Sequence, residues 1–157
     1  KIIGCMESFL AFWDLVRAAV PSDHLEGSLC SNPYAWWNDP IPFIDECKEY
    51  TAKYLSPEDA ASAMRNCGRI GGWGWGTIAA AAVERAVDNV GAKNMNSQAL
   101  RDALAATDLT VEGWGNTWEV VGDINCFLQT TRVMEYSGGE DDWTAITEWY
   151  RPPSLGG

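Results

Sequence analysis

Residues 68–91 read GRIGGWGWGTIAAAAVERAVDNVG, and this stretch organises the rest of the chain. Its first part is rich in glycine and carries Trp73 and Trp75, so we expect a glycine-broken loop where a ligand could be met. The second part predicts a helix, because it joins consecutive alanines to recurring valines and a charged face. Small alanine side chains let neighbouring backbones approach, so we expect this helix to be sandwiched against a sheet, with Gly91 as a left-handed cap.

The flanking sequence alternates between strand and helix patterns. Buried strands are expected over residues 1–5 and 26–30, and two further strands over 127–136 and 143–150, joined by a hairpin loop at 137–142. Helices are expected over residues 9–20, 40–54, 57–66 and 98–106, with Ser8, Ser56 and Ser97 as caps and Pro40 in a first turn. Strand–helix alternation followed by a terminal hairpin predicts an α/β fold.

The composition excludes several classes of function. The chain has 157 residues and a formal net charge of −11, which argues against binding to nucleic acid, because that requires a basic surface. The basic residues are too scattered for binding to anionic lipid, and no apolar run approaches the roughly 20 residues that span a bilayer. The chain opens directly on a buried strand, so we expect a mature fragment or a domain of a longer chain.

No metal, cofactor or catalytic motif stands out. Five cysteines accompany a single histidine and form no C-x-x-C pair, so no metal-binding pattern is present. There is no G-x-S-x-G elbow, P-loop or H-E-x-x-H helix, and the glycines at 72, 74 and 76 miss the dinucleotide fingerprint. We therefore predict no cofactor, no metal and no enzymatic activity, with His24 in a surface turn.

Glu7 and several aromatic residues are the candidate ligand-binding residues. Glu7 directly follows a buried strand, at the end where open α/β sheets bind ligands, and its carboxylate can hold an ammonium or hydroxyl group. Capping of the first helix is the alternative role for Glu7. Tyr34, Trp73 and Trp75 can stack on a flat ligand, although packing in the core would also explain them.

The motifs resemble, in order, the C-terminal half of a type I periplasmic solute-binding protein of the branched-chain amino-acid and amide group that feeds ABC transporters. The matching segments are IIGCMES, LEGSLCSNPYAWWNDPIPFIDECKEYTAKY, GGWGWGTIAAAAVERAV, SQALRDALAAT, GWGNTWEV and RVMEYSGG with WTAITEWY. The resemblance covers the whole chain, but the family's N-terminal half, with its serine- and threonine-bearing loops, has no counterpart here.

The resemblance implies a two-lobe α/β fold of the type I periplasmic-binding-protein kind, of which this chain is the C-terminal half. Lobe II would contain residues 1–30 and 126–157, the latter returning with the terminal hairpin, and lobe I residues 31–125. The lobes would close on a small solute by hinge bending. A disulfide between Cys30 and Cys126, at the two crossings, is conceivable.

The same resemblance implies partners and a location. The partners would be a solute, the missing N-terminal half on the same or a companion chain, and a membrane ABC permease. The location would be periplasmic or extracellular, with a lipoprotein anchor also compatible. Glu7 matches the family's loop acid that contacts a ligand amino group, Trp75 matches the aromatic residue before the alanine-rich helix, and Tyr34 lies just past a hinge crossing.

Two other classes of function stay open. One is an α/β enzyme with Glu7 as general acid or base, which requires a second titratable group within hydrogen-bond reach. The other is a carbohydrate-binding or adhesive module, which requires a flat row of exposed tryptophans. The high tryptophan content favours an aromatic or planar ligand over an aliphatic one.

Overall fold

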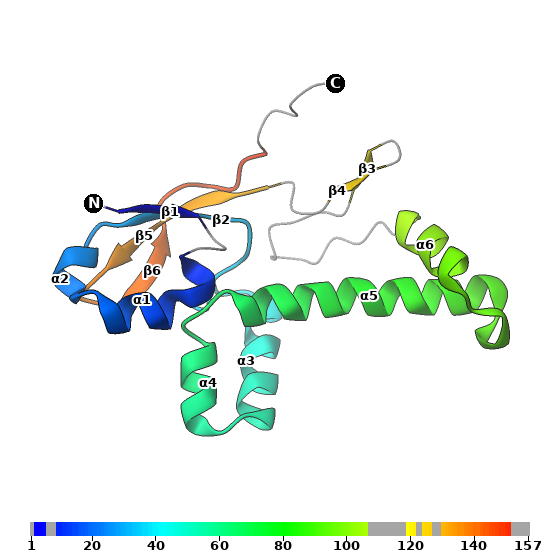
Figure 1. Cartoon of the computed structure of the whole chain (residues 1–157), viewed down its shortest axis with the longest axis horizontal. Coiled ribbons are helices and arrows are strands. Elements are labelled where there is room, and N and C mark those ends of the chain that lie inside the picture. Colours follow the sequence, from blue (N-terminus) through cyan, green and yellow to red (C-terminus); the bar gives the residue numbers. More distant parts are fainter. Residues whose placement is uncertain (1, 6–8, 107–118, 122–123, 127–129, 152–157) are drawn as a thin grey trace.

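The computed structural model describes residues 2–5, 9–106, 119–121, 124–126 and 130–151, which form a mixed α/β structure (Figure 1). The strands are β1 (Ile3–Cys5), β2 (Leu29–Asn32), β3 (Glu119–Val121), β4 (Ile124–Cys126), β5 (Arg132–Ser137) and β6 (Asp142–Ala145). The α-helices are α1 (Trp13–Ala19), α2 (Ser22–Leu25), α3 (Pro42–Tyr54), α4 (Pro57–Ala63), α5 (Gly68–Val90) and α6 (Ser97–Ala105), and 3-10 turns η1 and η2 span Leu10–Phe12 and Ala92–Asn94.

Four strands form one mixed sheet in the order β1-β2-β5-β6. β1 pairs with β2 in parallel, β5 pairs with β2 antiparallel, and β5 and β6 form an antiparallel hairpin in which Tyr136 faces Trp143. The side chains of β5 alternate between buried and half-buried positions, as expected for a strand with one face on the core. The predicted α/β class and terminal hairpin are confirmed, with shorter strands than the sequence indicated.

Aromatic side chains fill the core between the sheet and α1. The Trp13 ring lies 4.8 Å from the rings of both Tyr136 and Trp143, in edge-to-face geometry. Phe9 packs edge-on against Trp13 and Trp143, and a Cβ added to Gly4 would lie only 2.6 Å from Phe9 Cγ. The predicted helix over residues 9–20 is therefore present, although the regular α-helix begins only at Trp13 and ends at Ala19.

Helix α3, which follows Trp36 and Trp37, begins at Pro42 and has this proline in its first turn. The predicted start at Pro40 is therefore wrong by two residues. Asp39 has another role: its carboxylate accepts a hydrogen bond from the Trp36 N–H at 2.6 Å and forms an ion pair with Arg132. These contacts hold the preceding turn in a non-helical conformation. Tyr54, the last residue of this helix, is 69% exposed and stacks on Tyr50.

The caps of the next two helices fall partly where they were predicted. Ser56 caps α4, because its hydroxyl accepts a hydrogen bond from the Asp59 N–H at 3.2 Å. α4 ends at Ala63, three residues earlier than expected. The cap of α6 is Asn96, one residue before the predicted Ser97, and its amide oxygen accepts a hydrogen bond from the Ala99 N–H.

The predicted glycine-broken loop at residues 68–76 is wrong: these residues form the first turns of α5. The buried residues of this helix recur at helical spacing, namely Ile70, Gly71, Gly74, Ile78, Ala82 and Ala86. Their burial against the rest of the chain outweighs the cost of about 1 kcal/mol for each glycine in a helix. Gly91 ends the helix at a positive φ of 79°, but its ψ of 148° lies outside the left-handed helical region.

The expected packing of the alanine-rich helix against a sheet is not found in this chain. α5 packs against α3, η2 and α6, and Figure 1 shows it running away from the four-stranded sheet. Ala82 and Ala86 are buried, whereas Ala79, Ala80 and Val83 are exposed. The face of α5 that carries Ala82 and Ala86 is therefore covered by other parts of the chain, whereas the face that carries Ala79, Ala80 and Val83 is open to solvent. Among the described helices, none has the length and apolarity that a bilayer crossing requires.

A hollow at the junction of two helices as candidate functional site

Tyr34 is buried next to the end of β2. Its N–H donates to Asn32 Oδ1 at 3.1 Å, and the Asn32 amide donates to the Tyr34 carbonyl at 2.8 Å. A Cβ added to Gly71 would lie 3.2 Å from Tyr34 Cζ, so the ring lies directly against α5. Glu7, the other candidate near the start of the chain, lies outside the described residues.

Trp73 and Trp75 lie on different faces of α5. Because they are two residues apart on an α-helix, their side chains project about 200° apart around its axis. The Trp73 ring lies 5.0 Å from the Tyr50 ring, and both tryptophans are half-buried and pack against the core. The pair cannot enclose one flat ligand between them, so each is a candidate only by itself.

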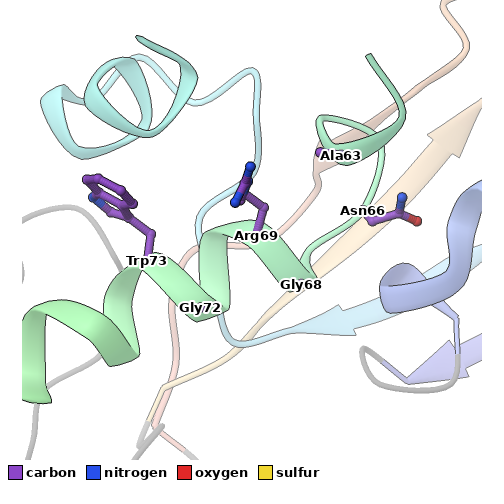
Figure 2. Close-up of a pocket in the computed structure, with 6 residues that line it drawn as sticks. All are labelled: Ala63, Asn66, Gly68, Arg69, Gly72 and Trp73. Carbon is purple, nitrogen blue, oxygen red and sulfur yellow. The ribbon is translucent and has the colours of Figure 1, made fainter. Parts of the chain in front are cut away.

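A hollow of about 490 Å³ opens where α4 ends and α5 begins. Its lining residues are Ala63, Asn66, Gly68, Arg69, Gly72 and Trp73 (Figure 2). No atom lies within 4 Å of the position that a Cβ would occupy at Gly68 or Gly72, so these glycines leave the space open. Arg69 and Trp73 are four residues apart and rise from the same side of α5 in Figure 2.

Asn66 forms a fixed wall of this hollow. Its Oδ1 accepts a hydrogen bond from the Asp14 N–H, and its Nδ2 donates to the Ser62 carbonyl. The Asn66 carbonyl also accepts from Trp37 Nε1 at 2.9 Å. These three bonds tie the loop between α4 and α5 to α1, to α4 and to the buried tryptophan, so the wall is held from three sides.

Arg69 has a different environment from three other arginines. Arg17, Arg65 and Arg132 are each ion-paired, whereas Arg69 makes no ion pair or hydrogen bond with another described side chain. Arg69 is half-buried and lines the hollow. Sequence reasoning missed this site because Gly68, Arg69, Gly72 and Trp73 share a face only once the segment is helical.

The buried Cys47 thiol on α3 is not activated. Burial raises the pKa of the Cys47 thiol above its ordinary value, an effect that the Thr51 hydrogen bond and the positive charge of Arg69 oppose only in part. The thiol is therefore neutral near physiological pH. Within the described residues, no group of three or more His, Cys, Asp and Glu is placed to hold a metal ion, and His24 is exposed on α2.

Tryptophans are core residues in the described part of the chain. Trp13, Trp36 and Trp143 are fully buried, Trp37 is 5% exposed, and Trp73, Trp75 and Trp149 are half-buried. Trp36 Nε1 donates to Asp142 Oδ1 at 2.7 Å. These seven side chains form no flat exposed row, and Trp114 and Trp118 lie outside the described residues.

The predicted lobes and their disulfide stay predictions. The side chain of Cys126 lies outside the described part, and Cys30 is buried beside β5. Residues from both sides of the predicted crossing at residue 30, among them Trp13 and Trp36, belong to one hydrophobic core.

Comparisons with known proteins identify the fold. No family model matches this sequence, and no curated protein matches it significantly. A crystal structure of a branched chain amino acid ABC transporter from Thermus thermophilus with bound valine is similar at a TM-score of 0.68 and 19% identity, covering 96% of this chain and 39% of that chain. A fatty acid ABC transporter substrate-binding protein from Thermomonospora curvata is similar at a TM-score of 0.67 and 17% identity, covering 98% of this chain and 37% of that chain.

These likenesses confirm the predicted fold class. Nearly the whole chain superposes on a part of each protein, so its fold is that of a partial type I periplasmic binding protein. The chain spans less than two fifths of the length of either neighbour. At this level of identity the likeness establishes the fold alone.

Proposed function

We propose that this chain is part of the extracytoplasmic substrate-binding component of an ABC transporter, and that the complete protein binds a small solute between two lobes. The observation that carries this proposal is the fold: the chain superposes over 96% and 98% of its length on two proteins of ABC transport systems. Lobe II contains residues 1–30 and 126–157, and lobe I contains residues 31–125. Ligand binding favours the closed arrangement because the ligand has higher affinity for it.

The protein acts without chemistry. Both neighbours belong to transport systems. The histidine is exposed, and burial raises the pKa of Cys47. A general acid–base pair needs two groups within hydrogen-bond reach.

The solute is an amino acid or another small organic acid. One neighbour is a branched chain amino acid ABC transporter with bound valine, and the other belongs to a fatty acid transporter. The burial of Trp13, Trp36 and Trp143 in the core removes the main argument for a planar ligand, since tryptophan content then reflects packing. Glu7 holds the ammonium group of an amino acid, with Tyr34, Trp73 and Trp75 near the cleft.

The remaining half of the fold and a membrane permease are the macromolecular partners. Ala79, Ala80 and Val83 form an exposed small-residue surface on α5, and such a surface suits close packing against a sheet. The N-terminal half of the fold, on the same or a companion chain, supplies that sheet. The complete protein acts in the periplasm or outside the cell, where it delivers solute to the permease.

Calorimetry of the complete protein with valine, phenylalanine and a medium-chain fatty acid tests this proposal. We expect one of these classes to bind, with compaction measured by small-angle X-ray scattering. If the ligand carries an amine, Glu7→Gln weakens binding by about 1.5–3 kcal/mol, the scale of a charged hydrogen bond.

Glu84→Gln is the matched control, because Glu84 is exposed in the middle of α5. It leaves affinity unchanged. Failure of all three solute classes to bind or to compact the complete protein would contradict a solute-binding role. Binding of an amine that is insensitive to Glu7→Gln would remove Glu7 from the site.

A further inference from the structure

We propose that the hollow lined by Arg69 and Trp73 binds a small aromatic carboxylate. This inference goes beyond the proposed function and does not depend on it, since it uses only residues 63–73 and their described neighbours. It rests on three observations: an open hollow, a half-buried arginine without an ion-pair partner among the described residues, and an indole ring beside it.

The charge at the hollow is the first step of the argument. The chain carries 22 acidic and 11 basic residues, so acidic partners are abundant. Arg69 nevertheless has no ion pair within the described part, whereas Arg17 and Arg132 have one each. A half-buried guanidinium is stabilised by a planar anion that accepts two parallel hydrogen bonds, and a carboxylate has that geometry.

The acidic residues described near the hollow do not neutralise Arg69. Asp14, which lies beyond Asn66, already accepts a hydrogen bond from the Ser62 hydroxyl at 2.6 Å and pairs with Arg65. Glu46, whose charge reaches the Cys47 thiol together with that of Arg69, is exposed to solvent. The α5 helix has no acidic residue in its first turn, so its positive end adds to the charge of the guanidinium.

The positions of Arg69 and Trp73 in the hollow favour a ligand whose carboxylate is attached to an aromatic ring. Arg69 and Trp73 rise from the same side of α5 toward α3 and α4 (Figure 2). Residues four apart on a helix have Cβ atoms about 5–6 Å apart, which matches a carboxylate joined directly to one ring. The Trp73 ring is backed by Tyr50 and offers its remaining surface to the ligand ring. A volume of about 490 Å³ accommodates such a molecule.

Nuclear magnetic resonance titration of the full chain with benzoate tests the proposal. The signals to follow are the Arg69 Nε–H and the Trp73 indole N–H, assigned with the variants Arg69→Gln and Trp73→Leu. We expect benzoate to shift both signals and to bind more tightly than acetate, which lacks the ring, or benzyl alcohol, which lacks the charge. Arg69→Gln lowers the benzoate affinity about tenfold, as expected for a lost charged hydrogen bond.

Three controls make the result interpretable. Arg101→Gln removes an exposed arginine of α6 and leaves the benzoate affinity unchanged. Arg69→Lys keeps the charge but not the bidentate geometry, and gives an intermediate affinity. Thermal unfolding verifies that Arg69→Gln is folded, which we expect because the Arg69 side chain makes no hydrogen bond to another described residue.

The outcome of the benzoate titration can be told apart from the outcome of the solute-binding calorimetry. Benzoate binding at this hollow is the same in Glu7→Gln, so either proposal can fail alone. Equal benzoate affinity in wild type and Arg69→Gln would overturn the inference. Binding of inorganic phosphate without benzoate would overturn it as well, because the aromatic part of the ligand would then have no role.

Discussion

Tyr136 joins the aromatic core to the surface of the hairpin. Its ring lies 4.8 Å from Trp13 and 5.6 Å from Trp143, and its hydroxyl donates to Asp141 Oδ1 at 2.7 Å. Asp141 adopts a positive φ of 56° in the turn and also pairs with Arg17. Burial raises the pKa of the Tyr136 phenol above its ordinary value of 10.0, and the hydrogen bond to Asp141 adds to this, while Arg17 opposes it.

This shift predicts how stability depends on alkaline pH. Because the folded pKa is raised, the folded state holds the phenolic proton more tightly than the unfolded state does. The contribution is fully present below the ordinary pKa of 10.0 and is lost as the pH rises through the folded value. We expect Tyr136→Phe to lower the free energy of unfolding by about 1 kcal/mol at neutral pH, because the hydrogen bond to Asp141 is lost. As the pH rises through the alkaline range, the stability of this variant should fall less steeply than that of wild type.

Urea unfolding across neutral and alkaline pH measures both effects. Tyr54→Phe is the matched control, because Tyr54 is 69% exposed, and it retains the wild-type slope. A Tyr136→Phe protein whose alkaline slope equals that of wild type would show that the phenol titrates alike in both states.

At the scale of single elements, α5 contains glycines with opposite surroundings. A Cβ added at Gly71 would lie 3.2 Å from Tyr34 Cζ, whereas one added at Gly76 would meet nothing within 4 Å. Both positions are helical. The close approach of Tyr34 therefore explains the glycine at 71, and no contact explains the one at 76.

We expect alanine to have different effects at these two positions. Gly76→Ala stabilises the protein by about 0.5–1 kcal/mol, because alanine has less backbone freedom to lose in a helix. Gly71→Ala gains the same propensity but displaces the buried Tyr34 ring, so it is less stable than Gly76→Ala by about 1 kcal/mol or more. Chemical denaturation of the two variants measures the difference, and equal stabilisation would show that Tyr34 yields freely.

On the scale of the whole molecule, an ion pair connects the segment before α3 to the sheet. The side chains of Arg132 and Asp39 are 7% and 18% exposed, and the Arg132 guanidinium also lies 4.6 Å from the centre of the Trp149 ring. Asn38 donates to the Trp143 carbonyl at 2.9 Å beside them. Segments far apart in the sequence are thereby joined through buried polar contacts.

Breaking this pair should cost far more than breaking an exposed one. Asp39→Asn leaves the Arg132 charge buried without its carboxylate, and we expect a loss of about 3 kcal/mol. Arg65→Gln, which breaks the Arg65–Asp14 pair with side chains 51% and 26% exposed, should cost less than about 1 kcal/mol. Equilibrium unfolding of both variants provides the comparison, and similar losses would mean that water screens the Arg132 pair equally.

The sequence by itself determined the features that depend on neighbours along the chain. The helical spacing of Phe9 and Trp13, the cap at Ser56 and the hairpin of β5 and β6 all follow from local periodicity or turn chemistry. The order of motifs also predicted the fold class that the structural likenesses confirm.

Only the tertiary structure decided that the glycine-rich residues 68–76 are helical, against their local preference for a loop. The glycines of α5 predict a loop locally, but burial of Ile70 and Ile78, with Tyr34 against Gly71, makes the segment helical. That change places Arg69 and Trp73 on one face and turns Trp75 to another. The hollow could not be predicted because its walls come from α4, the loop after it and α5, and only their packing defines which side chains share it.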